Sequence, residues 1–162
     1  MEPQDKPAID PEIRNELLTR ARAAAEHAYV PYSNFPVGAA VLTTDGSIHT
    51  GCNIENASYG LTICAERAAA SSAVSAGHRQ FVAVAVAAPK VPRTTPCGAC
   101  RQFLNEFRPA ESDMVIVLDD RGSGEPVNLD ALLPQAFGPR DLQPPRLAAN
   151  TPSAKRRADH GG

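Results

Sequence analysis

The chain has 162 residues, 43% of them hydrophobic, and a formal net charge of −2. This length favours one compact domain, and the longest apolar runs, such as Val82 to Ala88, are too short to cross a bilayer. The weak charge gives no broad basic surface for nucleic acid, and an N-terminus without the blocks of a secretory signal leads us to expect a cytoplasmic protein.

The first predicted element is a helix from Pro11 to about Tyr29. Asp10 can cap the free amide groups of the first turn, and proline is tolerated at the first helical position. Apolar side chains then recur at helical spacing: Ile13, Leu17, Leu18, Ala21, Ala24, Ala25 and Ala28. The prolines at 31 and 36 end the helix. Residues 37–44 and 47–53 predict a hairpin, because Asp45-Gly46 readily takes the positive backbone angles of a two-residue turn.

Helices and strands alternate in the rest of the chain. We predict strands at Phe81–Ala88, Met114–Leu118 and Val127–Leu129, and helices at Ala65–Ala76, Gly98–Phe107 and Asp130–Ala136. A hairpin followed by this alternation predicts a three-layer α/β/α domain with one mixed sheet of about five strands, formed by residues 1–146. Residues 147–162 contain few apolar side chains, and we predict that they form a disordered tail.

Three cysteines stand at the predicted starts of two helices, as Cys64-Ala65-Glu66 and as Pro96-Cys97-Gly98-Ala99-Cys100. In a reducing compartment, cysteines with a Cys-x-x-Cys spacing favour a metal site over a disulfide framework. Three thiolates supply three of the four ligands of a tetrahedral zinc ion and leave one position for water, as catalytic sites do. The amide groups at helix N-termini also favour the thiolate form.

A closed structural zinc site is the alternative, with Cys52 or one of the four histidines as the fourth ligand. His27 and His78 are predicted to lie on helices away from the motif, His49 on the hairpin, and His160 in the tail. Cys52 is predicted to be a buried, small apolar residue. Since no histidine has a ligand-like spacing to another, the open site is the favoured interpretation.

Two charged residues follow the first cysteine. Glu66 lies where a carboxylate can take a proton from a metal-activated water, although most glutamates simply lie on helix surfaces. Arg67 can donate hydrogen bonds to a ligand sulfur and offset the charge of three thiolates, and its alternative is a surface arginine.

The cysteine and glutamate motifs resemble those of the zinc-dependent cytidine deaminases, whose glutamate acts as acid and base. Further blocks are similar to the small, nucleoside-specific, homotetrameric branch of that family: Pro31 to Ala40, Gly51 to Ala57, Ile63 to Arg67 and Leu132 to Pro139. The likeness runs in order from about Pro11 to Leu142. It implies one Zn²⁺ per subunit, held by Cys64, Cys97 and Cys100, with Glu66 as the catalytic proton shuttle.

The same resemblance implies hydrolysis of cytidine and 2′-deoxycytidine to uridine and 2′-deoxyuridine with release of ammonia, in pyrimidine salvage. Asn53 and Glu55, which point to the same side of an extended segment, are then expected to hold the sugar, with a solvated strand face as the alternative. The backbone amide of Ala65 is expected to donate near the reacting centre. Phe35 and Phe137 are expected to pack on the pyrimidine. Tyr59 is expected to reach the sugar from a neighbouring subunit, with core packing as the alternative for all three aromatic residues.

Three other functions remain open at this point. A deaminase acting on a base within RNA or DNA needs a basic channel and often has histidine as its first ligand, whereas this chain has Cys64. Deamination of a cytosine-containing antibiotic would use the same ligands. A zinc-stabilised binding module would need no Glu66. We therefore expect a free nucleoside as the ligand, with no nucleic acid and no membrane as partners.

Overall fold

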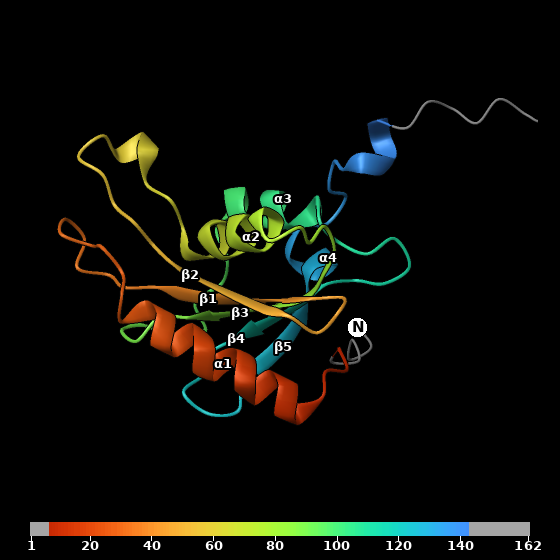
Figure 1. Ribbon diagram of the computed structural model, residues 1–162, viewed down its shortest axis with the longest axis horizontal. Coiled ribbons are helices and arrows are strands. Elements are labelled where there is room, and N and C mark those ends of the chain that lie inside the picture. Colours follow the sequence, from red (N-terminus) through yellow and green to blue (C-terminus); the bar gives the residue numbers. More distant parts are fainter. Residues whose placement is uncertain (1–6, 143–162) are drawn as a thin grey trace, which may run out of the picture.

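The computed structural model describes residues 7–142, which form one five-stranded sheet between two layers of helices (Figure 1). In chain order the elements are α1 (Pro11–Ala25), β1 (Gly38–Thr43), β2 (Ile48–Cys52), η1 (Tyr59–Leu61), α2 (Ala65–Ser75), β3 (Phe81–Ala87), α3 (Gly98–Asn105), β4 (Val115–Leu118), β5 (Glu125–Asn128), α4 (Leu129–Leu132) and η2 (Pro139–Leu142), where η marks a 3-10 turn. The predicted three-layer α/β/α fold is confirmed. The predicted tail, residues 147–162, lies outside the described residues.

The strands follow the order β2-β1-β3-β4-β5 across the sheet. Only β3 and β4 run parallel, and α3 lies in the crossover between them, as a parallel pair requires. α1 covers one face of the sheet, and α2, α3 and α4 cover the other (Figure 1). Within residues 7–142, no helix has the combination of length and apolar character needed to span a bilayer.

The hairpin and the central strand are confirmed, but the turn is longer than the predicted two residues. β1 pairs antiparallel with β2, Leu42 faces Ile48, and the amide of Thr43 donates to Ser47 O, so three residues, 44–46, form the turn. Gly46 has a φ of 88°, whereas Asp45 does not adopt a positive φ. β3 lies between β1 and β4, and all its side chains except that of Val82 are buried. An all-apolar strand covered by helices on both faces explains that pattern.

α1 begins as predicted but ends earlier. Asp10 Oδ1 accepts hydrogen bonds from the amides of Glu12 (2.8 Å) and Ile13 (3.3 Å), which caps the helix. The helix ends at Ala25 instead of about Tyr29, because the backbone of Tyr29 pairs with a distant segment. Its amide donates to Asn53 O, and its carbonyl accepts from the amide of Glu55. The sequence pattern of a helix carries no information about such a partner.

The last two predicted helices are also shorter than expected. α3 ends at Asn105, and α4 ends at Leu132. The chain cannot continue α4 to residue 136, because Gln135 adopts a φ of 56° in the left-handed region. Pro134 further lacks the amide proton that a helix interior needs.

α2 packs very closely on β2. A Cβ atom at Gly51 would lie 2.3 Å from the amide nitrogen of Ala69, so only glycine allows this approach. On the inner face of α2, the side chains of Ala69, Ala70 and Ala73 are buried and small. This contact fixes the position of the helix whose first turn carries Ala65, Glu66 and Arg67.

Candidate active site

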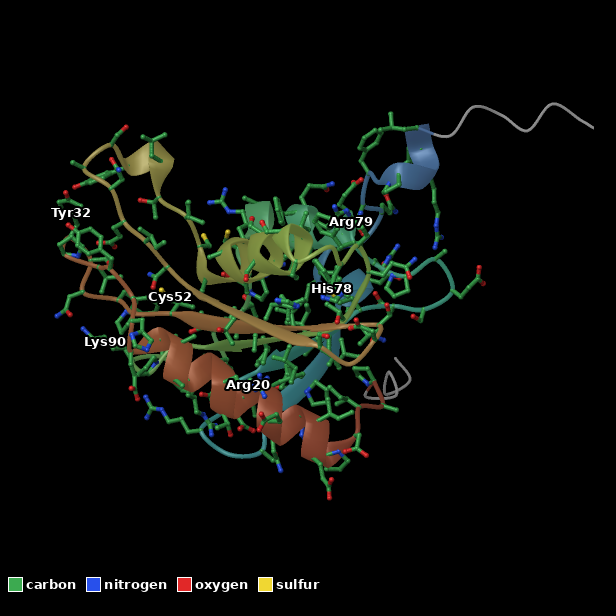
Figure 2. All side chains as sticks on the ribbon, viewed as in Figure 1. Arg20, Tyr32, Cys52, His78, Arg79 and Lys90 are labelled. Atoms are coloured by element: carbon green, nitrogen blue, oxygen red, sulfur yellow. The ribbon has the colours of Figure 1, made fainter. Side chains whose placement is uncertain are left out.

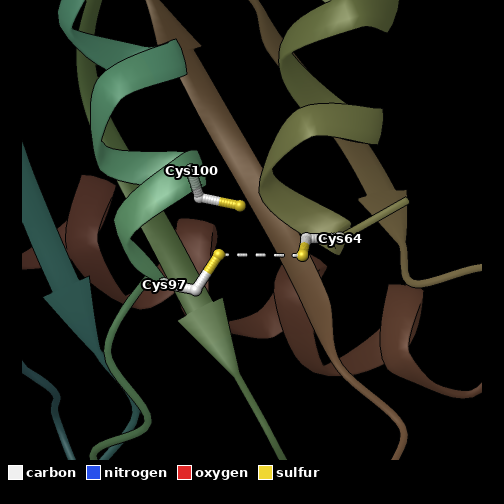
Figure 3. A group of neighbouring side chains, drawn as sticks. All are labelled: Cys64, Cys97 and Cys100. Carbon is white, nitrogen blue, oxygen red and sulfur yellow. Dashed lines mark hydrogen bonds between the residues drawn. The ribbon is translucent and has the colours of Figure 1, made fainter. Parts of the chain in front are cut away.

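Two helix starts bring the three predicted metal ligands together (Figure 3). Cys64 is the N-cap residue of α2, Cys97 is the N-cap residue of α3, and Cys100 lies in the first turn of α3. Because the first amides of each helix have no partner within the helix, they present partial positive charge to these sulfurs. Cys97 is exposed, Cys64 is half-buried and Cys100 is buried.

The spacing of the sulfurs fits a tetrahedral zinc ion. The Sγ atoms of Cys64 and Cys97 are 3.9 Å apart, and all three sulfurs lie within 4.8 Å of one another. With zinc–sulfur bonds of about 2.3 Å, tetrahedral geometry places sulfurs about 3.8 Å apart. The three cysteines are therefore able to hold zinc with little movement.

No fourth protein ligand joins this group among residues 7–142. Cys52 is half-buried, and its Sγ lies 3.4 Å from the carbonyl oxygen of His27, away from the other sulfurs (Figure 2). It is thus less buried than the sequence predicted. His49 and His78 stack on each other with ring centroids 4.8 Å apart. His27 and His78 follow α1 and α2 and do not lie on helices, which corrects that prediction.

The thiols interact strongly with one another. A hydrogen bond from the Cys100 thiol lowers the pKa of Cys64 to about 5, with further contributions from Arg67 and Cys97 against the opposing effect of burial. The same interaction raises the pKa of Cys100. Arg67 also donates from its Nη2 to Thr62 O at 3.0 Å, so its guanidinium lies between the cysteines and the segment that precedes α2.

Glu66 is the second residue of α2 and is only 4% exposed. Burial raises the pKa of this carboxyl group, and the charge on Cys64 adds to the rise. A carboxyl group with a raised pKa takes up and releases a proton more readily near neutral pH. Ala65, whose amide was predicted to donate near the centre, is fully buried at the first position of the same helix.

Asn53 binds the loop that carries Phe35. The amide of Val37 donates to Asn53 Oδ1 at 2.8 Å, and Asn53 Nδ2 donates to Phe35 O at 2.9 Å. Both ends of the asparagine side chain are therefore engaged with the backbone on either side of Pro36. This loop holds Phe35 half-buried.

Glu55 braces the same loop at its tip. Its Oε2 accepts from the amides of Tyr32 (2.9 Å) and Ser33 (3.2 Å). A hydrogen bond from the Ser33 hydroxyl is the main reason that the pKa of Glu55 is lowered. The carboxylate lines a cavity of about 320 Å³ together with Tyr32, Ser33, Tyr59 and Thr62.

The remaining two aromatic residues are exposed. Tyr59 is 75% exposed, and its ring lies 5.9 Å from that of Tyr32. Phe137 is 59% exposed and follows α4, and its own carbonyl oxygen accepts two hydrogen bonds from side chains of α3. The structure thus groups Asn53, Glu55 and Phe35, places Tyr59 beside Glu55 in the cavity, and leaves Phe137 on a separate segment.

The sequence analysis did not single out Ser33 or Thr62, which line the cavity with Glu55. Ser33 lies two residues before Phe35, and its Oγ accepts from the amide of Phe35 at 3.0 Å. A serine at this spacing in a turn is a local signal that sequence alone offers. Thr62 carries no such signal, because its place in the cavity depends on the bridge that pairs Ile63 with Ile54.

The fold and these contacts define an α/β protein with a three-cysteine metal centre beside a buried glutamate. The chain matches the model of the cytidine and deoxycytidylate deaminase zinc-binding region over residues 11–117, and it belongs to this family. The expectation of a zinc cofactor is confirmed by this match together with the three-cysteine cluster.

Individual relatives agree with the family match. The cytidine deaminase of Sporosarcina psychrophila is 48% identical over 128 residues, which cover 78% of this chain and 93% of the relative. That of Halalkalibacterium halodurans is 49% identical over 129 residues, which cover 80% of this chain and 97% of the relative. The crystal structure of cytidine deaminase from Burkholderia pseudomallei superposes with a TM-score of 0.69 at 47% identity, and covers 75% of this chain and 97% of that one.

Proposed function

We propose that this chain catalyses the hydrolytic deamination of cytidine and 2′-deoxycytidine to uridine and 2′-deoxyuridine, with release of ammonia, as a step of pyrimidine salvage in the cytoplasm. The observation that carries the proposal is the cluster of Cys64, Cys97 and Cys100, three ligands without a fourth among residues 7–142, beside the buried Glu66. Relatives that are 48% and 49% identical carry the name cytidine deaminase.

Zinc held by the three cysteines supplies Lewis-acid chemistry, because it acidifies water and stabilises negative charge on oxygen. Glu66 accepts a proton from the attacking water and gives it to N3 of the cytosine ring, which makes C4 more electrophilic. After the oxygen has bonded to C4, Glu66 takes the hydroxyl proton and passes it to the amino group. The C4–N bond then breaks, and ammonia leaves. The raised pKa of Glu66 suits a group that must both accept and donate.

The neighbouring residues bind and orient the nucleoside in this proposal. Asn53 and Glu55 hold the sugar: Glu55 lines the cavity, and Asn53 is hydrogen-bonded to the neighbouring loop that carries Phe35. Phe35 and Phe137 pack on the pyrimidine, and the amide of Ala65, free at the start of α2, donates near C4. Arg67 withdraws charge from the ligand sulfurs, and its hydrogen bonds contribute to the lowered pKa of Cys64.

The active unit in this proposal is a homotetramer. Several large apolar side chains are exposed on the segments around the cavity, where a second subunit would cover them: Tyr29, Tyr32, Ile54, Tyr59, Leu61 and Ile63. Both segments, residues 29–36 and 54–63, project from the same side of the molecule (Figure 1). Tyr59 then reaches the sugar bound by a neighbour.

A direct assay tests the proposed reaction. Purified protein is incubated with cytidine, and the loss of cytosine absorbance is followed while zinc is quantified per subunit. We expect turnover with about one zinc per subunit, loss of turnover after chelation, and recovery when zinc is added back. Cytosine within single-stranded RNA or DNA should remain unchanged. Failure of the zinc-loaded protein to convert cytidine, or preference for the polymer, would refute the proposal.

A further inference from the structure

The peptide group between Phe137 and Gly138 is held by three side chains. Its carbonyl oxygen accepts hydrogen bonds from Gln102 Nε2 at 2.9 Å and Asn105 Nδ2 at 3.2 Å. Its amide, on Gly138, donates to Asp141 Oδ2 at 2.7 Å. Because a peptide group is planar, fixing both its oxygen and its nitrogen fixes the orientation of the whole plane.

Two of these side chains come from successive turns of α3. Asn105 is only 6% exposed, so its amide is committed to this contact and not to solvent. A Cβ atom at residue 138 would lie 2.9 Å from Asn105 Nδ2, so glycine at 138 is what lets the asparagine reach the carbonyl. The Asn105 amide group therefore packs closely against both the Phe137 carbonyl and Gly138.

The backbone of Phe137 is held by hydrogen bonds, whereas its side chain is exposed. It is 59% exposed, although an apolar ring of this size is normally buried when it serves only packing. A backbone held by three hydrogen bonds that carries an exposed ring is the arrangement expected of a residue that contacts another molecule. The conformational cost of ordering the backbone of this segment has then been met in advance.

The helix that supplies Gln102 and Asn105, α3, also carries two of the metal ligands. α3 begins after Cys97 and contains Cys100, so Gln102 and Asn105 have a fixed relation to the cysteine cluster. We propose that Gln102, Asn105 and Asp141 are positioning residues, which hold the backbone that carries the Phe137 ring and thereby set the position from which the ring contacts the base of the nucleoside. This inference rests on the proposed function, and it adds three residues that act only through Phe137.

The first test is a double-mutant cycle between Gln102 and Phe137. Gln102 is exposed, so Gln102→Glu removes the donor without a buried charge. We expect KM for cytidine to rise about fivefold with kcat nearly unchanged, as for loss of one hydrogen bond. In a Phe137→Ala background, the same change should have no further effect on KM. A full effect in that background, or no effect in the wild type, would overturn the proposal.

Matched variants separate positioning from general destabilisation. Gln80→Glu makes the same chemical change at an exposed residue whose carbonyl accepts from Thr44 beside the hairpin, and it should leave KM unchanged. Asp141 is also exposed. Asp141→Ala should raise KM, whereas Asp141→Asn keeps an acceptor oxygen and should restore most of the wild-type value. Equal effects of the two Asp141 variants would contradict a role for the hydrogen bond from Gly138.

A second readout does not depend on turnover. The chain contains no tryptophan, so Phe137→Trp introduces a single fluorescent reporter at this position. Gln102→Glu in that background should increase the fast motion of the indole, seen as lower fluorescence anisotropy, and Gln80→Glu should not. Unchanged anisotropy would refute the positioning role of Gln102, even in a protein that converts cytidine. If anisotropy falls as expected but the protein does not convert cytidine, the proposed function is refuted and the positioning of residue 137 by Gln102 is not.

Discussion

The metal half and the sugar half of the candidate site are built by different means. Cys64, Cys97, Cys100 and Glu66 lie at helix starts that are packed on the sheet, and the cluster needs nothing beyond one chain. The other half consists of the loops at 31–37 and 53–63, held by side-chain hydrogen bonds and lined by the exposed rings of Tyr32 and Tyr59. In the proposed function, the bond-making chemistry is therefore built into the subunit, whereas the sugar half leaves exposed rings for a second subunit to cover.

The largest expected effect is on the metal half. Cys100→Ser replaces a buried ligand thiol by a weaker ligand, so zinc content should fall to near zero and turnover should fall below detection. Zinc per subunit and cytidine turnover are measured on the same preparation. Cys52→Ser makes the same change at the thiol outside the cluster, and it should keep both values. If Cys100→Ser retained stoichiometric zinc, the ligand assignment would be wrong.

The next effect separates metal binding from proton transfer. Glu66→Gln preserves size but cannot shuttle protons, so kcat should fall about 10³-fold while zinc content stays near one per subunit. Glu106→Gln makes the same substitution at an exposed residue at the end of α3 and should leave kcat unchanged. Wild-type turnover in Glu66→Gln would show that Glu66 is not the proton shuttle.

The same division explains what could be predicted from the sequence. The cysteine motif and Glu66 could be assigned to one centre because helix N-caps and a Cys-x-x-Cys spacing are local signals, and the apolar run of β3 is local too. The early end of α1 could not be predicted, because Tyr29 pairs with Asn53 and Glu55 across the fold. Such pairings depend on tertiary structure.

The roles of the polar residues were only partly predictable for the same reason. That Asn53 and Glu55 lie on one side of the chain follows from their spacing. That they bind the backbone of residues 32–37 does not, since the loop lies about twenty residues earlier in the sequence. The carbonyl of Phe137 likewise meets α3 only because the segment after α4 turns back on that helix.

A smaller effect is expected in the sugar half. Glu55→Gln weakens the acceptor for the Tyr32 and Ser33 amides, and KM for cytidine should rise about tenfold, close to the lower end of the range for hydrogen bonds to a charged group. Free cytosine, which has no sugar, should be converted with little change. Equal losses on both substrates would show that Glu55 does not act through the sugar.

The ionisation of Glu55 fixes how this effect depends on pH. The pKa of Glu55 is lowered in the folded chain, mainly by the hydrogen bond from the Ser33 hydroxyl. The stabilisation of the loop by the Glu55 carboxylate is therefore fully present above the usual glutamate pKa of about 4.3, and it is lost only as pH falls through the lowered value. KM profiles of the wild type and of Glu55→Gln should therefore run parallel between about pH 6 and 8. Profiles that converge in this range would mean that Glu55 titrates there.

The smallest predicted effect tests whether the sugar half is completed by a second subunit. Tyr59 is 75% exposed, so Tyr59→Ala costs the isolated subunit little packing. We expect KM to rise about threefold, as for a partly buried contact, and the oligomer to dissociate at higher protein concentration than the wild type. Sedimentation velocity over a dilution series measures the second effect, and Leu142→Ala, at an exposed apolar residue of η2, is the control. If Tyr59→Ala raised KM in a protein that remained monomeric throughout, the tyrosine would act within its own subunit, and both halves of the site would then belong to one chain.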